Sequence, residues 1–116
     1  MPEAQLIGIP VRELETPVLL VNLDAMERNL DRMAENLEGT GVKLRAHGKT
    51  HKSPYLARKQ IARGAVGVCC QKVSEAEVMA EGGVENILVS SEVVSASKLR
   101  RLAALTRHTK QIGRAS

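Results

Sequence analysis

Apolar and polar positions alternate along the chain in an order that combines short strands with amphipathic helices. Apolar runs at 42–47, 65–70 and 86–90 each have the length of a buried strand. Each run is followed by a stretch of about ten to fifteen residues in which apolar positions recur at helical spacing. The pattern therefore predicts three successive strand–helix units.

Residues that favour helix ends stand at the expected places in these units. The helices are predicted to start near Ser53-Pro54, Ser74 and Ser95, because a serine side chain can cap free amides and Pro54 suits a first turn. Gly64 and the pair at 82–83 should end the first two helices.

A further helix is expected before the first unit. The run at 18–23 has the composition of a strand, and Asp24 stands three residues before Glu27, in the arrangement of a capping box. We therefore expect a strand to end and a helix to begin at Asp24. The apolar residues of this helix share one face and are Met26, Leu30, Met33 and Leu37.

Strands that alternate with helices favour an α/β fold with a parallel sheet, because a crossover between parallel strands needs a helix. Units of this length fit a doubly wound sheet or an eight-stranded barrel. A closed barrel needs eight strands, and the segment 110–116 does not resemble a fourth one. We expect a leader and strand at 1–23, a partial barrel at 24–109, and an atypical or truncated tail at 110–116.

Composition restricts the core and the setting of the protein. With 43% hydrophobic residues, one Tyr, and no Phe or Trp, the core must be aliphatic. No apolar run is long enough to cross a bilayer, and the first residues lack the features of a secretory signal. We expect a cytoplasmic protein without a membrane partner. Cys69 and Cys70 are adjacent, which favours reduced, buried thiols.

The net charge of +4 is modest, and the basic residues are spread over three segments rather than gathered in one tail. The segment 98–110 is basic, but it contains no aromatic residue that could stack on bases, and leucines occupy a packing face within it. A solvated outer helix explains this segment better than a nucleic-acid interface, and we expect no nucleic-acid partner.

The densest polar cluster, at 45–52, follows the first of the repeated strands. In α/β folds, ligands bind at the carboxyl ends of the strands. If the strand continues to Lys49, then Arg45, His47 and Lys49 share one face. Such a face is costly to bury unless it meets an anionic ligand. A lysine amine there can attack an aldehyde carbonyl, although a solvated basic loop explains the same pattern.

The motifs around this cluster resemble a known family. The segments 44–54 (LRAHGKTHKSP) and 64–77 (GAVGVCCQKVSEAE) are similar to the D-threonine aldolase and D-serine dehydratase family, as are 15–17, 23–24 and 86–92. The resemblance implies a pyridoxal-phosphate barrel of the alanine racemase N-terminal type.

Within that resemblance, the cofactor lysine falls on Lys49, which is also the expected catalytic residue. Arg45, His47 and Gln71 are the further cofactor-binding candidates, with Gln71 suited to hydrogen-bond the ring oxygen. The family usually has proline at the position of Ala46 and commonly alanine at that of Gly48, so the turn should be looser here.

The resemblance also implies a divalent metal, whose His and Cys or Asp ligands would lie beyond Ser116, and a homodimer for the full-length protein. His47 and His51 have the spacing of a metal pair on a helix, but Gly48 and the expected loop argue against a metal site there. Other polar residues should reach the rim or cap a helix. Those at the rim are Lys72, Ser90, Ser91 and Glu92, and the cap is Ser74 with Glu77.

The resemblance thus implies a pyridoxal-phosphate-dependent lyase acting on a D-amino acid, by retro-aldol cleavage or by dehydration. We expect the chain to be an amino-terminal portion that is inactive alone. Two other classes are kept open. A non-catalytic cofactor-binding fragment would react with the aldehyde without turnover, and a small basic nucleic-acid-binding module would bind oligonucleotides with a steep salt dependence.

Overall fold

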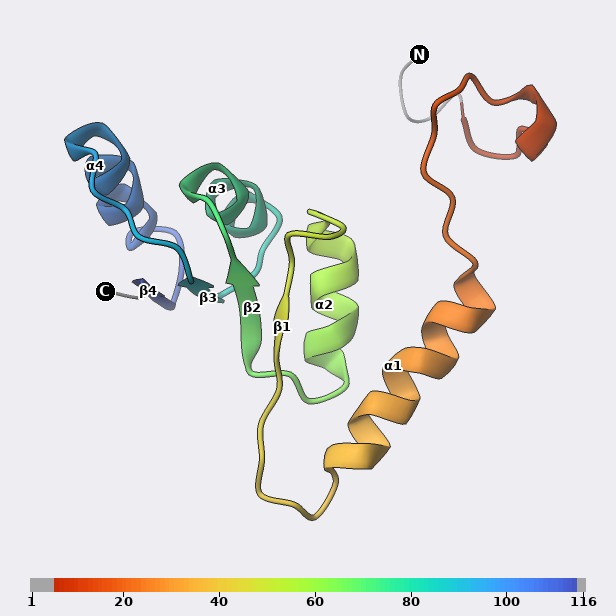
Figure 1. The fold of residues 1–116 in the computed structure, drawn as a ribbon, viewed down its shortest axis with the longest axis horizontal. Coiled ribbons are helices and arrows are strands. Elements are labelled where there is room, and N and C mark those ends of the chain that lie inside the picture. Colours follow the sequence, from red (N-terminus) through yellow and green to blue (C-terminus); the bar gives the residue numbers. More distant parts are fainter. Residues whose placement is uncertain (1–5, 115–116) are drawn as a thin grey trace.

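The computed structural model describes residues 6–114, which form a four-stranded parallel sheet with helices along one face (Figure 1). The elements in chain order are the 3₁₀ helix η2 (Val11–Glu13), α1 (Leu23–Leu37), β1 (Arg45–His47), α2 (Pro54–Ala62), β2 (Gly67–Cys70), α3 (Val73–Glu81), β3 (Asn86–Val89), α4 (Ala96–Leu105) and β4 (Gln111–Arg114). The three predicted strand–helix units are confirmed, and a fourth strand follows them.

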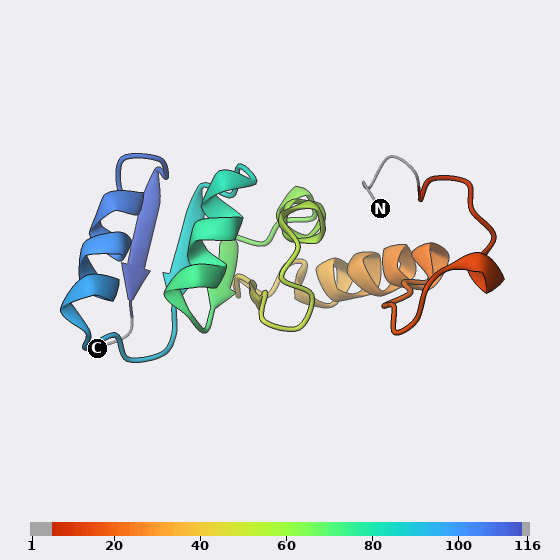
Figure 2. The same cartoon turned by 90° about the horizontal axis from the view of Figure 1, so that it is seen from above.

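The sheet has the winding of a barrel rather than of a doubly wound sheet. Its order is β1-β2-β3-β4, and all three pairings are parallel. Helices α2, α3 and α4 lie on the same side of it (Figure 2), whereas a doubly wound sheet carries helices on both faces. The sheet order and the one-sided helices are therefore those of part of a (β/α)8 barrel.

The core lies between the sheet and these helices and is aliphatic, as expected. The strand register places one residue of each strand side by side across the sheet, on the face toward the helices. These residues are Ala46, Val68, Ile87 and Ile112. Met79 of α3 is fully buried against this layer. The opposite face of the sheet, here called the open face, has no helix over it and carries the row His47, Cys69, Leu88 and Gly113.

The strand predicted over 18–23 is wrong. Residues 18–22 are irregular, and Leu23 is already the first residue of α1. A strand needs a neighbour to satisfy its backbone groups, and the sheet in the described residues begins only at β1. The helix cap is Asn22 rather than Asp24, because the Asn22 side chain accepts a hydrogen bond from the Ala25 amide at 2.9 Å.

The expectation that 110–116 is atypical is also wrong for the described part of that segment. Residues 111–114 form β4, which pairs with β3 in parallel register, with Ile87 opposite Ile112. Backbone hydrogen bonds to an existing strand do not require an apolar run, and Ile112 alone supplies the contact with the core. Residues 115–116 of the expected tail and 1–5 of the expected leader lie outside the described residues.

The cap predicted for α3 lies two residues away from the observed one, whose N-cap is Lys72. Glu75, rather than Ser74 with Glu77, holds the start of the helix, since its carboxylate accepts hydrogen bonds from the amides of Gln71 (3.0 Å) and Lys72 (2.6 Å). Glu77 instead pairs with Arg101 of α4.

Helix α1 stands at one end of the molecule (Figure 1). It has no buried residue, and polar contacts attach it to α2: Glu27 pairs with Lys59 and Arg63, and Asp31 pairs with Arg63 at 2.6 Å. None of the helices in residues 6–114 is long and apolar enough to cross a bilayer.

Candidate functional site

The candidate site lies at the carboxyl ends of the strands, where a tight turn follows β1. The Gly48 amide donates to the Cys69 carbonyl at 2.7 Å, which attaches the start of the turn to β2. The Lys52 amide donates to the Gly48 carbonyl at 2.8 Å, and Lys52 has a left-handed backbone with φ of 53°. The position of Lys49 is therefore set from both sides.

Lys49 lies in this turn and not on the strand. The sequence would place it on one strand face with Arg45 and His47 only if the strand continued to Lys49, and β1 instead ends at His47. Its side chain is exposed, and within the described residues it forms no ion pair. Its amide donates to Nδ1 of His47 at 3.2 Å, which keeps the residue at the strand tip.

His47 joins the tips of two strands through hydrogen bonds. Its Nε2 lies 3.4 Å from Oγ of Ser90, which directly follows β3, and this Oγ donates to the Cys70 carbonyl at 3.2 Å. Since Nδ1 accepts the Lys49 amide, the neutral ring carries its proton on Nε2 and donates it to Ser90. The chain of contacts from Lys49 through His47 to Ser90 fixes both the tautomer and the ring orientation.

Arg45 lies on the open face of β1, which it shares with His47, because alternate residues of a strand point to the same face. Its guanidinium donates to the Val68 carbonyl at 3.4 Å. The side chain passes over Gly67, where an added Cβ would come within 2.7 Å of an Arg45 nitrogen. Gly67 thus provides the space that lets a cation lie flat on the sheet.

Two other polar residues flank the turn. Gln71 directly follows β2 and is exposed, so the structure places it at the same rim as Lys49. His51 accepts the Ser53 amide on Nδ1 at 2.9 Å, and its buried Nε2 has no hydrogen-bond partner in the part of the chain that the structure describes. His51 therefore orders the end of the turn.

Gly48 lies where the turn packs against the helix layer. A Cβ at this position would lie 2.9 Å from both Cε of Met79 and Cγ2 of Val68. The glycine therefore allows the turn to pack closely on the helix layer. Burial raises the pKa of the Cys70 thiol to about 12, so this thiol is not a nucleophile at neutral pH, whereas Cys69 is only half-buried.

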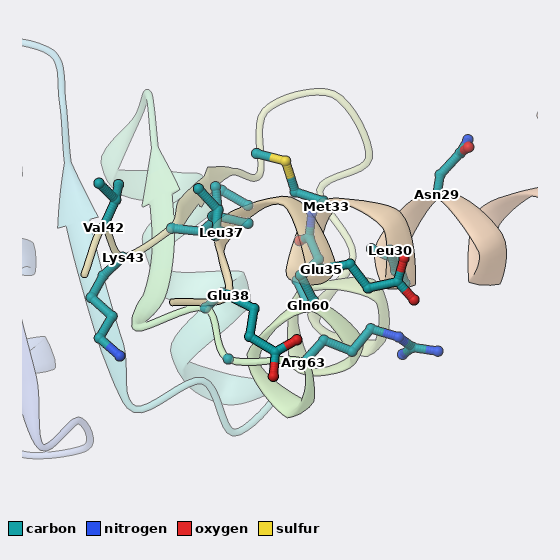
Figure 3. Close-up of a pocket in the computed structure, with 15 residues that line it drawn as sticks. Asn29, Leu30, Met33, Glu35, Leu37, Glu38, Val42, Lys43, Gln60 and Arg63 are labelled. Carbon is teal, nitrogen blue, oxygen red and sulfur yellow. The ribbon is translucent and has the colours of Figure 1, made fainter. Parts of the chain in front are cut away.

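The cavities lie elsewhere. One of about 550 Å³ is bounded by α1, the segment 42–46 and α2, with Met33 and Leu37 on one side and Gln60 and Arg63 on the other (Figure 3). It does not include Lys49. Among residues 6–114, no group of three His, Cys, Asp or Glu side chains is placed to hold a metal ion.

Comparison with known proteins agrees with this arrangement. A family model described as the alanine racemase N-terminal domain matches residues 21–111. The chain belongs to the alanine racemase N-terminal domain family. The matched residues include β1, β2, β3 and the first residue of β4. They also include the turn that carries Lys49.

Members of this family with known names match the chain over most of its length. It is 46% identical over 99 residues to the 3-hydroxy-D-aspartate aldolase of Paracoccus denitrificans (strain Pd 1222), which covers 84% of this chain and 26% of that protein. A crystal structure of D-threonine aldolase from Filomicrobium marinum superposes with a TM-score of 0.82 at 50% identity, covering 90% of this chain and 28% of that one.

A third relative is the D-threo-3-hydroxyaspartate dehydratase of Delftia sp. (strain HT23), 41% identical over 75 residues, which cover 65% of this chain and 20% of that protein. The chain spans about a quarter of the length of the curated relatives it matches. The resemblance read from the sequence is therefore confirmed at the level of the family.

Proposed function

We propose that this chain carries the cofactor lysine of a pyridoxal-phosphate-dependent lyase that acts on β-hydroxy D-amino acids. The observation that carries the proposal is the position of Lys49, an exposed amine held at the rim of a parallel sheet by its hydrogen bond to His47. Ligands of α/β folds bind at this rim. The named relatives act on D-threonine, 3-hydroxy-D-aspartate or D-threo-3-hydroxyaspartate, all with a β-hydroxyl group.

The residues at the rim fit such a group. Lys49 Nζ would hold the aldehyde covalently, while Gln71, exposed at the end of β2, can donate a hydrogen bond to the ring oxygen. Arg45 presents a cation on the open face, where no helix blocks the approach of an anion. His47 orients the turn through Ser90.

Pyridoxal phosphate, when bound, supplies the electron sink for cleavage at the α-carbon. The contribution of this chain is then proton transfer and positioning. With the substrate amine bound in place of Lys49, the free Nζ would be the group at the rim that transfers a proton at the α-carbon: it would deliver one there after aldol cleavage, or take one from there in dehydration. The proposal also includes the divalent metal that the family resemblance implies. Its ligands would lie outside the described residues.

We favour aldol cleavage over dehydration. The matches at 46% and 50% identity are named aldolases, and a further named aldolase matches at 41% over 103 residues, whereas the named dehydratase matches at 41% over 75 residues in sequence and at 36% in structure comparison. For D-threonine this reaction releases glycine and an aldehyde, whereas dehydration releases ammonia.

The cofactor assignment is tested on the full 116-residue chain. After incubation with pyridoxal phosphate and reduction with borohydride, peptide mass spectrometry should find the pyridoxyl group on Lys49. The variant Lys49→Ala should lose at least about tenfold of this labelling, because the acceptor amine is removed. Lys52→Ala and Lys72→Ala, which remove exposed lysines nearby, should keep it. Labelling that persists in Lys49→Ala contradicts the proposal.

We further propose that the 116-residue chain binds the cofactor without turnover, since it spans about a quarter of its relatives and leaves one face of the sheet uncovered. An assay with D-threonine should detect neither glycine nor ammonia above the level of the Lys49→Ala variant. Turnover that depends on Lys49 would show this part of the proposal to be wrong while leaving the cofactor assignment intact.

A further inference from the structure

Two exposed lysines share the turn after β1, so exposure does not decide which of them takes an aldehyde. Within the described residues, neither Lys49 nor Lys52 forms an ion pair. They differ in what holds their backbone. The Lys49 amide donates to Nδ1 of His47 at 3.2 Å, whereas the Lys52 amide donates to the Gly48 carbonyl within the turn. Of the two lysines, Lys49 is therefore the one tied to a side chain of β1.

The hydrogen bond to Nδ1 holds Lys49 only while the His47 ring keeps its orientation. The ring is exposed, so packing around it does not fix it. Its other nitrogen, Nε2, lies 3.4 Å from Oγ of Ser90. Ser90 follows β3, and His47 ends β1, so this contact spans the end of β2 between them. The orientation of the ring therefore depends on the Ser90 hydroxyl.

The Ser90 hydroxyl is itself oriented by the end of β2. Its Oγ donates to the Cys70 carbonyl at 3.2 Å, and the Ser90 amide donates to the same carbonyl at 2.8 Å. The other end of this peptide group is the Gln71 amide, which donates at 3.0 Å to the carboxylate of Glu75, a buried side chain. Since the hydroxyl proton points to Cys70, Oγ can only accept from His47. The acceptor for the ring is thus held in a fixed place.

We infer that Ser90 is a positioning residue for the cofactor lysine: through His47 it holds Lys49 at the strand end and so favours Lys49 over Lys52 as the amine that takes the aldehyde. The inference rests on the proposed function, because it concerns which amine carries pyridoxal phosphate. In this condensation Nζ forms a C=N bond to the aldehyde carbon, and the carbonyl oxygen leaves as water with two amine protons. An amine on an ordered backbone loses less conformational freedom when it is fixed in this way.

The test measures which lysine is labelled in the whole 116-residue chain. Pyridoxal phosphate is added at a concentration that labels only part of the protein, and after borohydride reduction peptide mass spectrometry gives the ratio of label on Lys49 to label on Lys52. Ser90→Ala should lower this ratio by about three- to tenfold, the effect of one lost hydrogen bond. Ser90→Thr, which keeps a hydroxyl, should stay within about twofold of the wild type. Ser74→Ala, which removes an exposed serine of α3, should leave the ratio unchanged.

A double-mutant cycle shows whether Ser90 acts through His47. His47→Ala should lower the labelling ratio by a similar factor, because the Lys49 amide loses its acceptor. Ser90→Ala added to His47→Ala should then lower the ratio by less than about twofold more, since the contact between them is already gone. An equal effect of Ser90→Ala with and without His47 overturns the inference.

Hydrogen exchange followed by NMR gives a measurement that needs no cofactor. In Ser90→Ala the Lys49 amide should exchange at least about threefold faster than in the wild type, because the His47 ring that accepts its proton is no longer held. The Val68 amide of β2 should keep its wild-type protection, which shows that the sheet remains folded. Unchanged exchange at Lys49 overturns the inference.

The outcomes separate this inference from the proposed function. A wild-type chain without pyridoxyl label on Lys49 overturns the proposed function, and the inference with it. A wild-type chain that is labelled on Lys49, with a ratio that Ser90→Ala leaves unchanged, overturns the inference alone.

Discussion

Gly67 and Gly113 both lie on the open face, but their surroundings differ at the scale of single atoms. A Cβ on Gly67 would collide with the Asn86 carbonyl oxygen and would lie 2.8 Å from Asn86 Cβ. A Cβ on Gly113 would meet only Cδ1 of Leu88, at 3.8 Å, which is ordinary contact. The glycine of β2 is therefore required for β3 to lie beside it, and the glycine of β4 is not.

Gly67→Ala should lower the free energy of unfolding by about 1–3 kcal/mol, because backbone atoms of the neighbouring strand must move. Gly113→Ala is the matched control and should change it by less than about 0.5 kcal/mol. Urea unfolding followed by circular dichroism measures both values. Equal losses in the two variants would show that the close approach at Gly67 does not matter.

Which residues form the candidate site could be predicted from the sequence, but not how they contact one another. Lys49, Gln71 and Ser90 were placed at the rim because each follows a strand, and the structure has them there. The hydrogen bond between His47 and Ser90 joins residues 43 positions apart, and no periodicity indicates it. Likewise, the space that Gly67 leaves for Arg45 depends on strand register, which the sequence does not state.

At the scale of elements, a bidentate ion pair between Glu77 and Arg101 joins helices α3 and α4. Arg101 donates to the two carboxylate oxygens of Glu77 at 2.7 and 2.6 Å. The hydrogen bonds from Arg101 hold the pKa of Glu77 below its ordinary value of 4.5. The pair therefore favours the folded state wherever the carboxylate is ionised.

The stabilisation from Glu77 should be fully present above pH 4.5 and should disappear as the pH falls through the lowered native pKa. Glu77→Gln should accordingly lower the Tm at pH 7, and the difference from the wild type should vanish in acid. Because both side chains are partly exposed, salt should reduce the effect. Glu81→Gln, in the same helix, should show no such pH dependence.

The sequence predicts an element well where a periodic pattern of apolar residues extends over many positions. It predicts an element poorly where strand formation depends on a neighbouring strand. The strand–helix units at 42–109 were found because each combines a buried run with a helical face. The run at 18–23 is more apolar than β4, yet only β4 becomes a strand, because β3 lies beside it. A pattern along one segment says nothing about whether a partner edge is available.

At the scale of the whole molecule, every strand pairs with the one next to it along the chain. Arg45 lies opposite Gly67, Val68 opposite Ile87, and Ile87 opposite Ile112, so each pairing closes a short loop. Low contact order of this kind speeds folding. During synthesis, each new strand can add to a finished neighbour as it leaves the ribosome, without waiting for residues that have not yet been translated.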